Sequence, residues 1–211
     1  MIYVIDRRHF GSFTNEILEM HRLRFRVFKQ RLNWDVTTSG DLEIDEFDAL
    51  APVYLLHCNA DGNVDGSVRL LPTTGPNMLR NTFPSLLGSE PAPQDQTVWE
   101  ASRFAVDTPL GSRTNPGSLS LATFELFAAT LEFGMSRELR DIVAVVDMRM
   151  ERILRRAGWT LRRLGQARSI GNTFAVAGLL EISPAVLARI RTLGGLYGPL
   201  LAEPLQLKET A

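Results

Sequence analysis

The chain has 211 residues, of which 45% are apolar and 22% are charged, and its formal net charge is −1. This length suits a single domain spanning residues 1–211, and the near-zero charge excludes a general electrostatic attraction to nucleic acid. No apolar run approaches the ~20 residues of a membrane span, and charged residues interrupt the N-terminal segment where a signal peptide needs its apolar core. The single cysteine, Cys58, fits a reducing compartment, so we expect a cytoplasmic protein without a nucleic-acid or membrane partner.

Strands and helices are expected to alternate as β-α-β-β-β-α-β-α-β-β-α. Apolar alternation and short apolar runs predict strands at residues 2–6, 53–58, 64–71, 97–106, 142–146, 159–166 and 172–180. Helical periodicity and capping residues predict helices at residues 15–31, 118–139, 148–157 and from 184 onward. The proline-rich stretch 72–97 is expected to be a loop that contains a short helix near residues 78–87. This order indicates an α/β fold, an α+β sandwich with a mixed sheet, and the Gly-x-Gly-x-x-Gly motif of dinucleotide-binding folds is missing after the first strand.

The first helix, which we expect Thr14 to cap, carries Arg24 and Phe28 on one face because they are four residues apart. Trp34 follows just past its end. A cation fixed beside two aromatic rings can hold a planar or sulfonium-bearing ligand. From these residues alone, a core helix whose arginine reaches toward solvent is the simpler interpretation.

An acidic segment follows the helix, with five carboxylates in residues 41–48, Asp45 and Asp48 among them. Such a run is usually a solvated loop, and it lacks the glycine and the terminal glutamate of a calcium-binding EF-hand loop, so we expect no metal. Arg69 is a charge inside the predicted strand 64–71 and needs a carboxylate partner, which Asp45 or Asp48 can provide.

The most informative segment is residues 99–107, Trp-Glu-Ala-Ser-Arg-Phe-Ala-Val-Asp. In a regular strand Glu100 and Ser102 face one side and Arg103 the other, so Glu100 and Arg103 can converge only at a β-bulge. A buried glutamate with a raised pKa can remove a proton from an amine. A salt bridge on an edge strand is an equally good interpretation of these residues.

Taken together, these positions resemble the acyl-homoserine lactone synthase family. The matching residues are Arg24, Phe28, Trp34, Asp45, Asp48, Arg69, Phe83, Glu100, Ser102 and Arg103. Residues 151–159, Glu-Arg-Ile-Leu-Arg-Arg-Ala-Gly-Trp, extend the resemblance. It implies a mixed sheet similar to that of the GCN5-related N-acetyltransferases, with helices on both sides and a cleft between splayed strands.

The resemblance also implies the reaction and the residues. The methionine amine of S-adenosylmethionine attacks an acyl thioester, and the carboxylate then closes the lactone and releases methylthioadenosine, without a cofactor or a metal. Glu100 is the implied base, and Asp48 and Arg69 belong to an ionic scaffold. The S-adenosylmethionine pocket would contain Arg24, Phe28, Trp34, Asp45, Ser102 and Arg103. The acyl pocket would contain Phe83, Phe104, Phe124, Ala144, Val146 and Met148.

The acyl group is less well defined. The strand 142–146 is wholly apolar, which favours a dry pocket, disfavours a 3-oxo acyl chain and resembles the branch that takes short branched or aromatic groups from coenzyme A. An acyl carrier protein is the other possible donor. Two alternative functions stay open, an acetyl-coenzyme A-dependent N-acetyltransferase of the same fold and a non-enzymatic ligand-binding protein.

Overall fold

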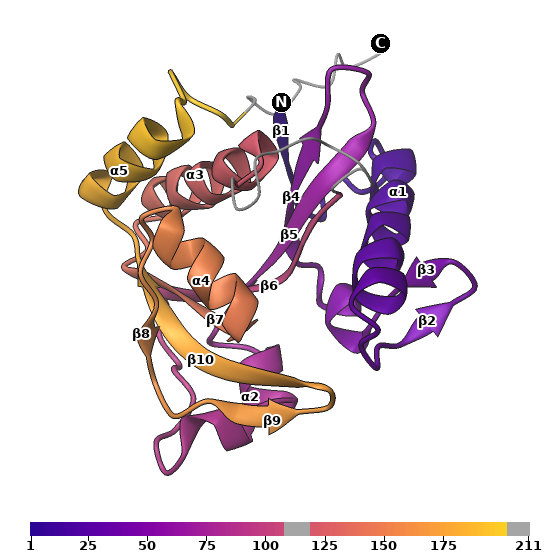
Figure 1. The fold of residues 1–211 in the computed structure, drawn as a ribbon. Helices are drawn as coiled ribbons and strands as arrows, with labels where there is room; N and C mark the ends of the chain where they lie inside the picture. The colour runs from indigo at the N-terminus through magenta and orange to yellow at the C-terminus, as the bar shows by residue number, and fades with distance from the viewer. Residues whose placement is uncertain (108–118, 202–211) are drawn as a thin grey trace.

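The computed structural model describes residues 1–107 and 119–201 (Figure 1). Its main sheet has eight strands, ordered β1-β4-β5-β6-β7-β10-β8 with β9 added beside β10. All neighbours are antiparallel except β6 and β7. The strands are β1 Ile2–Ile5, β4 Val53–Cys58, β5 Val64–Pro72, β6 Val98–Val106, β7 Asp141–Asp147, β8 Arg162–Arg163, β9 Arg168–Ile170 and β10 Thr173–Glu181. A separate hairpin pairs β2 Thr38–Ser39 with β3 Leu42–Glu43.

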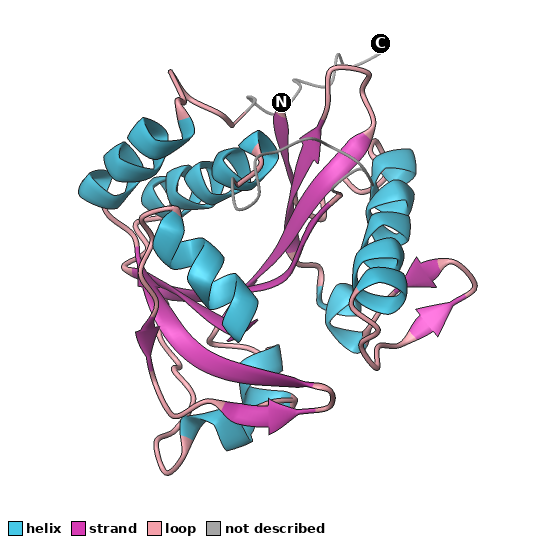
Figure 2. Cartoon of the chain, viewed as in Figure 1, coloured by secondary structure: helices cyan, strands magenta, loops and turns pink. Residues whose placement is uncertain are grey.

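Helices cover both faces of the sheet (Figure 2). On one face Met20 and Leu23 of α1 pack against Leu56 of β4, and on the other Leu126 of α3 packs in a core that includes Leu55. The alternation of Leu55 and Leu56 explains how one strand serves two cores. The α-helices are α1 Thr14–Arg24, α2 Met78–Asn81, α3 Leu121–Ser136, α4 Met148–Arg156 and α5 Pro184–Gly194. A π-helix, Phe25–Arg31, continues α1, and short 3-10 helices span Glu46–Leu50 and Pro84–Leu87.

The sheet opens between β6 and β7. The two strands pair in parallel only from Val98–Ala101 to Asp141–Ala144, although each continues beyond that seam. The remaining part of β6 keeps its antiparallel partner β5, and the remaining part of β7 keeps β10. The expected mixed sheet, with helices on both sides and splayed strands, is therefore confirmed.

Local predictions fail mainly at element ends. Thr14 does not cap α1, because its hydroxyl donates to the carbonyls of Phe10 and Gly11 and α1 begins without a side-chain cap. The predicted strand 159–166 shrinks to the two residues of β8, and β2, β3 and β9 were not predicted, since two- and three-residue strands leave almost no periodic signal. Within the described residues, no helix is both long and apolar enough to cross a membrane.

Candidate active site

A β-bulge shapes the centre of β6. Arg69 of β5 opposes Ser102 and Ser67 opposes Ala105, so Val68 faces two residues of β6 where a regular ladder would give it one. Arg103, one of these two, has a φ of +54°, in the left-handed region that non-glycine residues rarely adopt. The bulge turns Arg103 to the face that carries Glu100 and Ser102, as the sequence required for these side chains to converge.

An ionic network lies under the bulge. Its members are three arginines and three carboxylates, namely Arg24, Arg69, Arg103, Glu43, Asp45 and Asp48. The side chains of Arg24 and Arg69 have no exposed surface, and that of Arg103 is 13% exposed. Buried guanidinium groups are tolerated only when carboxylates neutralise them, and here each cation has two carboxylate partners.

Asp48 joins two of these arginines. It accepts two hydrogen bonds from Arg24, at 2.8 and 2.9 Å, and one from Arg69 at 2.8 Å. Burial opposes the charged form, but the hydrogen bonds and charge of Arg24, with Arg69, hold the pKa of Asp48 well below its usual range. Tyr54 also donates to Asp48, and burial with this carboxylate raises the pKa of the Tyr54 hydroxyl. Asp48 is therefore a permanent anion of the scaffold.

The interpretation of residues 41–48 as a solvated loop is wrong for three of its carboxylates. The side chains of Glu43, Asp45 and Asp48 are at most 7% exposed, whereas that of Asp41 is 67% exposed. Glu43, which was not predicted, binds Arg24 at 2.5 Å and Arg103 at 2.9 Å. The sequence signal for Glu43 was the number of arginines near the site. Arg24, Arg69 and Arg103 each need carboxylate partners once they are buried. Across the described ranges, no group of three or more metal-ligating side chains could hold an ion.

Asp45 sits between two cations at the edge of the network. It accepts from Arg69 at 2.5 and 3.0 Å and pairs with Arg103 at 2.8 Å, and it caps the 3-10 helix Glu46–Leu50 by accepting from the backbone N–H of Phe47. Because the cap fixes its backbone and two guanidinium groups fix its carboxylate, Asp45 presents a rigid surface to the cavity that it lines.

Glu100 lies 1% exposed beside the network. Its two oxygens accept the backbone N–H groups of Met78, at 3.0 Å, and Leu79, at 2.7 Å, at the start of α2. Burial raises the pKa of Glu100 although these two donors, Arg69 and Arg103 favour its charged form. The carboxyl group thus combines a raised pKa with a fixed orientation, and the edge-strand salt bridge considered from sequence is not what the structure shows.

Two aromatic rings extend the site beyond the bulge. Phe28 and Trp34 stack with centroids 5.4 Å apart and planes 6° from parallel, and the Arg103 guanidinium lies 5.7 Å from the Phe28 centroid. The π-helix places this pair, because Trp34 donates its backbone N–H to the Phe28 carbonyl just after the helix ends. Single π turns are rare and often occur at functional sites.

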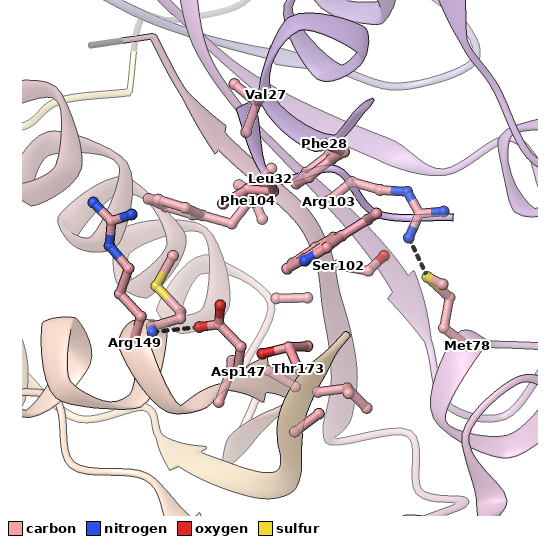
Figure 3. Close-up of a pocket in the computed structure, with 18 of the residues that line it drawn as sticks. Val27, Phe28, Leu32, Met78, Ser102, Arg103, Phe104, Asp147, Arg149 and Thr173 are labelled. Carbon is pink, nitrogen blue, oxygen red and sulfur yellow. Dashed lines mark hydrogen bonds between the residues drawn. The ribbon is translucent and has the colours of Figure 1, made fainter. Parts of the chain in front are cut away.

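All these features border one cavity of about 870 Å³ between the splayed strands (Figure 3). The charged arm of the cavity is bordered by Phe28, Trp34, Asp45, Met78, Glu100 and Arg103. The other arm, which we name the acyl arm after the acyl pocket expected from the sequence, is bordered mainly by Phe104, Phe127, Ala144, Val146, Met150, Ile153, Leu154, Trp159 and Leu180. The two arms meet at Ala101 and Ser102, where β6 leaves β7.

Most of the predicted site residues reach the cavity wall. Those that line it are Phe28, Trp34, Asp45, Phe83, Glu100, Ser102, Arg103, Phe104, Ala144 and Val146. Arg24, Asp48 and Arg69 lie behind the wall, in the ionic network. For Asp48 and Arg69 this position matches the predicted scaffold. Arg24 has no exposed surface, so it cannot contact a ligand directly as the S-adenosylmethionine pocket would require. It does not reach toward solvent either, which was the simpler interpretation of the sequence.

Phe124 and Met148 do not line the acyl arm, contrary to our prediction. Phe124 packs against Gly194 of α5, because the cavity face of α3 is instead the Thr123, Phe127 and Thr130 row. In α4 the wall residues are Arg149, Met150, Ile153 and Leu154, and Met148, the first residue of the helix, is not among them.

The acyl arm is also less apolar than strand 142–146 suggests. The side chains of Ser120, Thr123 and Thr130 line it from α3 and its cap. Thr130 donates to the Leu126 carbonyl at 2.8 Å, and Ser120 and Thr123 share a hydrogen bond of 2.8 Å, so each hydroxyl is already satisfied and can still accept or be redirected. The apolar lining predicted from strand 142–146 therefore does not extend to the α3 wall of this arm, and the acyl group stays a prediction.

Comparisons with known proteins agree on one family. Residues 10–190 match the autoinducer synthase family. The chain is 42% identical over 189 residues to an acyl-homoserine-lactone synthase of Agrobacterium fabrum, covering 90% of each chain. It also resembles the crystal structure of the acyl-homoserine lactone synthase LasI, with a TM-score of 0.78 and 35% identity over 97% of this chain and 98% of the other.

A third comparison is with a coenzyme A-dependent acyl-homoserine lactone synthase, BjaI, solved with S-adenosylmethionine and isopentyl-coenzyme A. Its TM-score is 0.84 at 25% identity, covering 96% of this chain and 92% of the other. A putative N-acetyltransferase from Lactobacillus plantarum, at 14% identity and a TM-score of 0.55, shares the fold alone, with 86% of this chain and 99% of the other covered.

The splayed sheet therefore gives the protein a fold similar to that of the N-acetyltransferases. The chain belongs to the autoinducer synthase family and is an acyl-homoserine-lactone synthase. This result removes the non-enzymatic alternative and the generic N-acetyltransferase alternative.

Proposed function

We propose that the enzyme joins S-adenosylmethionine to an acyl thioester in two steps. The methionine amine attacks the thioester carbonyl, an amide C–N bond forms, and the C–S bond breaks to release the thiol. A carboxylate oxygen then attacks the γ-carbon, the C–S bond to the sulfonium breaks, and methylthioadenosine leaves as the lactone closes. The observation that carries this proposal is one cavity with two chemically different arms that meet beside a buried carboxyl group.

We assign the charged arm to S-adenosylmethionine. A sulfonium cation favours the stacked rings of Phe28 and Trp34 and the nearby carboxylate of Asp45. Ser102 and Arg103 add polar groups at the junction of the arms. The similar protein solved with S-adenosylmethionine, and another, TofI, solved with an inhibitor and methylthioadenosine, support this choice of ligand.

We assign proton removal to Glu100. The substrate amine is protonated at neutral pH and attacks only after it loses a proton. Glu100 lines the cavity, and its raised pKa brings it closer to the working pH than an exposed carboxylate. Because both its oxygens accept backbone N–H groups, the proton reaches it through a remaining lone pair or a bridging water.

We assign the acyl arm to the thioester. Beyond Ala101 and Ala144 the two strands no longer pair with each other, so their backbone groups can bind the pantetheine arm and the thioester oxygen. Direct transfer needs no serine or cysteine nucleophile. We propose a short branched or aromatic acyl-coenzyme A as donor, supported by the two coenzyme A-dependent synthases whose structures align at TM-scores of 0.83 and 0.84. The hydroxyls on α3 also suit a chain that carries an oxygen.

A single variant tests the assignment. Glu100→Gln keeps an acceptor for one backbone N–H and removes the base, so we expect turnover to fall by ~10²–10⁴-fold while S-adenosylmethionine still binds. Product lactone and methylthioadenosine are measured together by mass spectrometry, with a panel of acyl-coenzyme A and acyl carrier protein thioesters. Near wild-type turnover in the variant would contradict Glu100 as the base, and no methylthioadenosine from the wild type with any donor would contradict the reaction.

A further inference from the structure

Met78 makes contacts that the proposed chemistry does not explain. Its thioether sulfur accepts a hydrogen bond from Arg103 Nη1 at 3.1 Å (Figure 3). It accepts a second one from Arg69 Nη2 at 3.2 Å. Met78 is 6% exposed, lines the cavity and packs against Phe47 and Leu71. A thioether therefore lies between two guanidinium groups on the wall of the charged arm.

A thioether is a poor partner for these donors. Sulfur in methionine is a weak, uncharged acceptor, whereas a carboxylate forms short charge-assisted hydrogen bonds with guanidinium groups. The other N–H groups of Arg69 and Arg103 bind Asp45, Asp48, Glu43 and Ser102, all of which hold oxygen acceptors. The donors directed at Met78 are thus more weakly satisfied than the donors of the same two arginines that bind oxygen.

The position of this weak contact matters because Arg103 is the arginine of the ionic network that borders the cavity. Arg103 stands over Phe28, which stacks on Trp34, so its guanidinium group lies beside the site that we assign to the methionine part of the substrate. The same residue, Met78, also donates its backbone N–H to Glu100. One residue therefore contacts both the anion-binding cations and the assigned base.

We propose that the Met78 thioether is a placeholder acceptor, which holds the guanidinium groups of Arg69 and Arg103 in place until the α-carboxylate of the amino-acid substrate takes over the Arg103 donor. This inference rests on the proposed function, since it names the group of S-adenosylmethionine that the charged arm recognises. Met78 is a positioning residue, and it acts through Arg103 on the substrate carboxylate.

The proposal predicts opposite effects for two variants. Met78→Leu keeps the volume and removes the acceptor, so Arg103 is unsatisfied in the free enzyme and gains more from a substrate carboxylate. Met78→Gln supplies a stronger amide oxygen, which competes better with the carboxylate. Stronger carboxylate recognition in the first variant and weaker recognition in the second is the expected pattern.

The experiment measures the dissociation constants of S-adenosylmethionine and of decarboxylated S-adenosylmethionine by calorimetry on the full chain, without acyl donor. In the wild type we expect S-adenosylmethionine to bind at least about tenfold more tightly than its decarboxylated form. This difference is the contribution of the carboxylate. We expect the ratio of the two constants to rise about threefold in Met78→Leu and to fall about threefold in Met78→Gln.

Met20→Leu is the matched control, because Met20 is a buried methionine in the α1 core outside the cavity, and it should leave the ratio unchanged. Thermal melting shows whether each variant is folded. If Met78→Leu does not fold, Met78→Gln alone still tests the direction in which the ratio of the two dissociation constants changes. Equal weakening of both ligands in both variants would show that Met78 only fills space and overturns the proposal. If the wild type binds neither compound, the amine donor itself is wrong.

Discussion

The two arms of the cavity differ in how their walls are held. The charged arm rests on buried ion pairs that tie Arg24, Arg69 and Arg103 to carboxylates of the segment 43–48. The acyl arm is built from apolar side chains of α3, α4, β7 and β10, such as Phe127, whose ring is tilted against Phe104 and edge-on to Trp159. One wall is fixed by directional bonds and the other by packing.

This difference determines how strictly each arm can select its substrate. Directional groups reject a ligand that leaves them unpaired, by factors far larger than a hydrophobic pocket achieves against one methylene more or less. We therefore expect strict selection of the amine donor and graded selection of the acyl chain. Variants that change the wall of one arm at a time test this difference in selectivity.

The largest effect should follow from Asp48→Ala. Removing this carboxylate leaves parts of Arg24 and Arg69 buried without a partner, which should lower the free energy of unfolding by ~3–5 kcal/mol in urea titrations. Asp41→Ala is the control, because its ion pair with Arg22 is exposed and should contribute little to stability. Equal losses in the two variants would mean that the network does not hold the charged arm.

A smaller effect should follow from narrowing the acyl arm. Ala144→Leu adds bulk on β7 just where the strands separate, so KM for longer acyl donors should rise about tenfold, with little change for the shortest donors. The dissociation constant of S-adenosylmethionine should stay constant in the same protein. A parallel change in both constants would show that the arms are not independent.

The smallest effect concerns two histidines, one behind each arm. Burial alone would lower the pKa of His57, but its hydrogen bonds to Asp65 and Glu125 raise it, and they tie α3 to the β4–β5 hairpin. The stabilisation from this raised pKa is complete below the unfolded pKa, near 6.5, and is lost as the pH rises through the higher folded pKa. His57→Gln should therefore destabilise the protein most at low pH.

His21, beside the charged arm, should behave in the opposite way. Burial and then the charge of Arg24 lower its pKa, and its Nδ1 lies 2.9 Å from the Glu43 carbonyl. The neutral form is favoured in the fold, so the wild type loses stability as the pH falls below 6.5 and the unfolded chain takes up the proton first. His21→Gln should remove that loss. Urea titrations from pH 5 to pH 8 measure how the difference in unfolding free energy between the wild type and each histidine variant changes with pH. The two differences should change in opposite directions, and a change of the same sign would contradict this assignment.

Much of this site could be predicted because the relevant signals are local. The bulge at Arg103 follows from the need to bring Arg103 to the face of Glu100, and the partners of Arg69 follow from the cost of burying a lone charge. The resemblance to a known family supplied the functional roles. These are properties of single residues and their immediate neighbours.

What could not be predicted depends on rotation and on distant contacts. Phe124 and Met148 were assigned to the wrong helix faces, since an apolar residue gives no sign of which of two apolar neighbours it meets. Glu43 was hidden among exposed carboxylates, and its burial depends on Arg24 and Arg103, which are 19 and 60 residues away. The hydroxyls of Thr123 and Thr130 enter the cavity only because α3 lies across the splayed strands.

The seam between β6 and β7 has a mechanical consequence. Four residue pairs, Val98–Ala101 with Asp141–Ala144, join the half of the sheet that carries the ionic network to the half formed by β7, β8, β9 and β10. Because the two halves pair over so short a seam, the width of the opening depends on the angle between them. Amide hydrogen exchange at these four pairs would show whether the seam stays paired when the substrates bind.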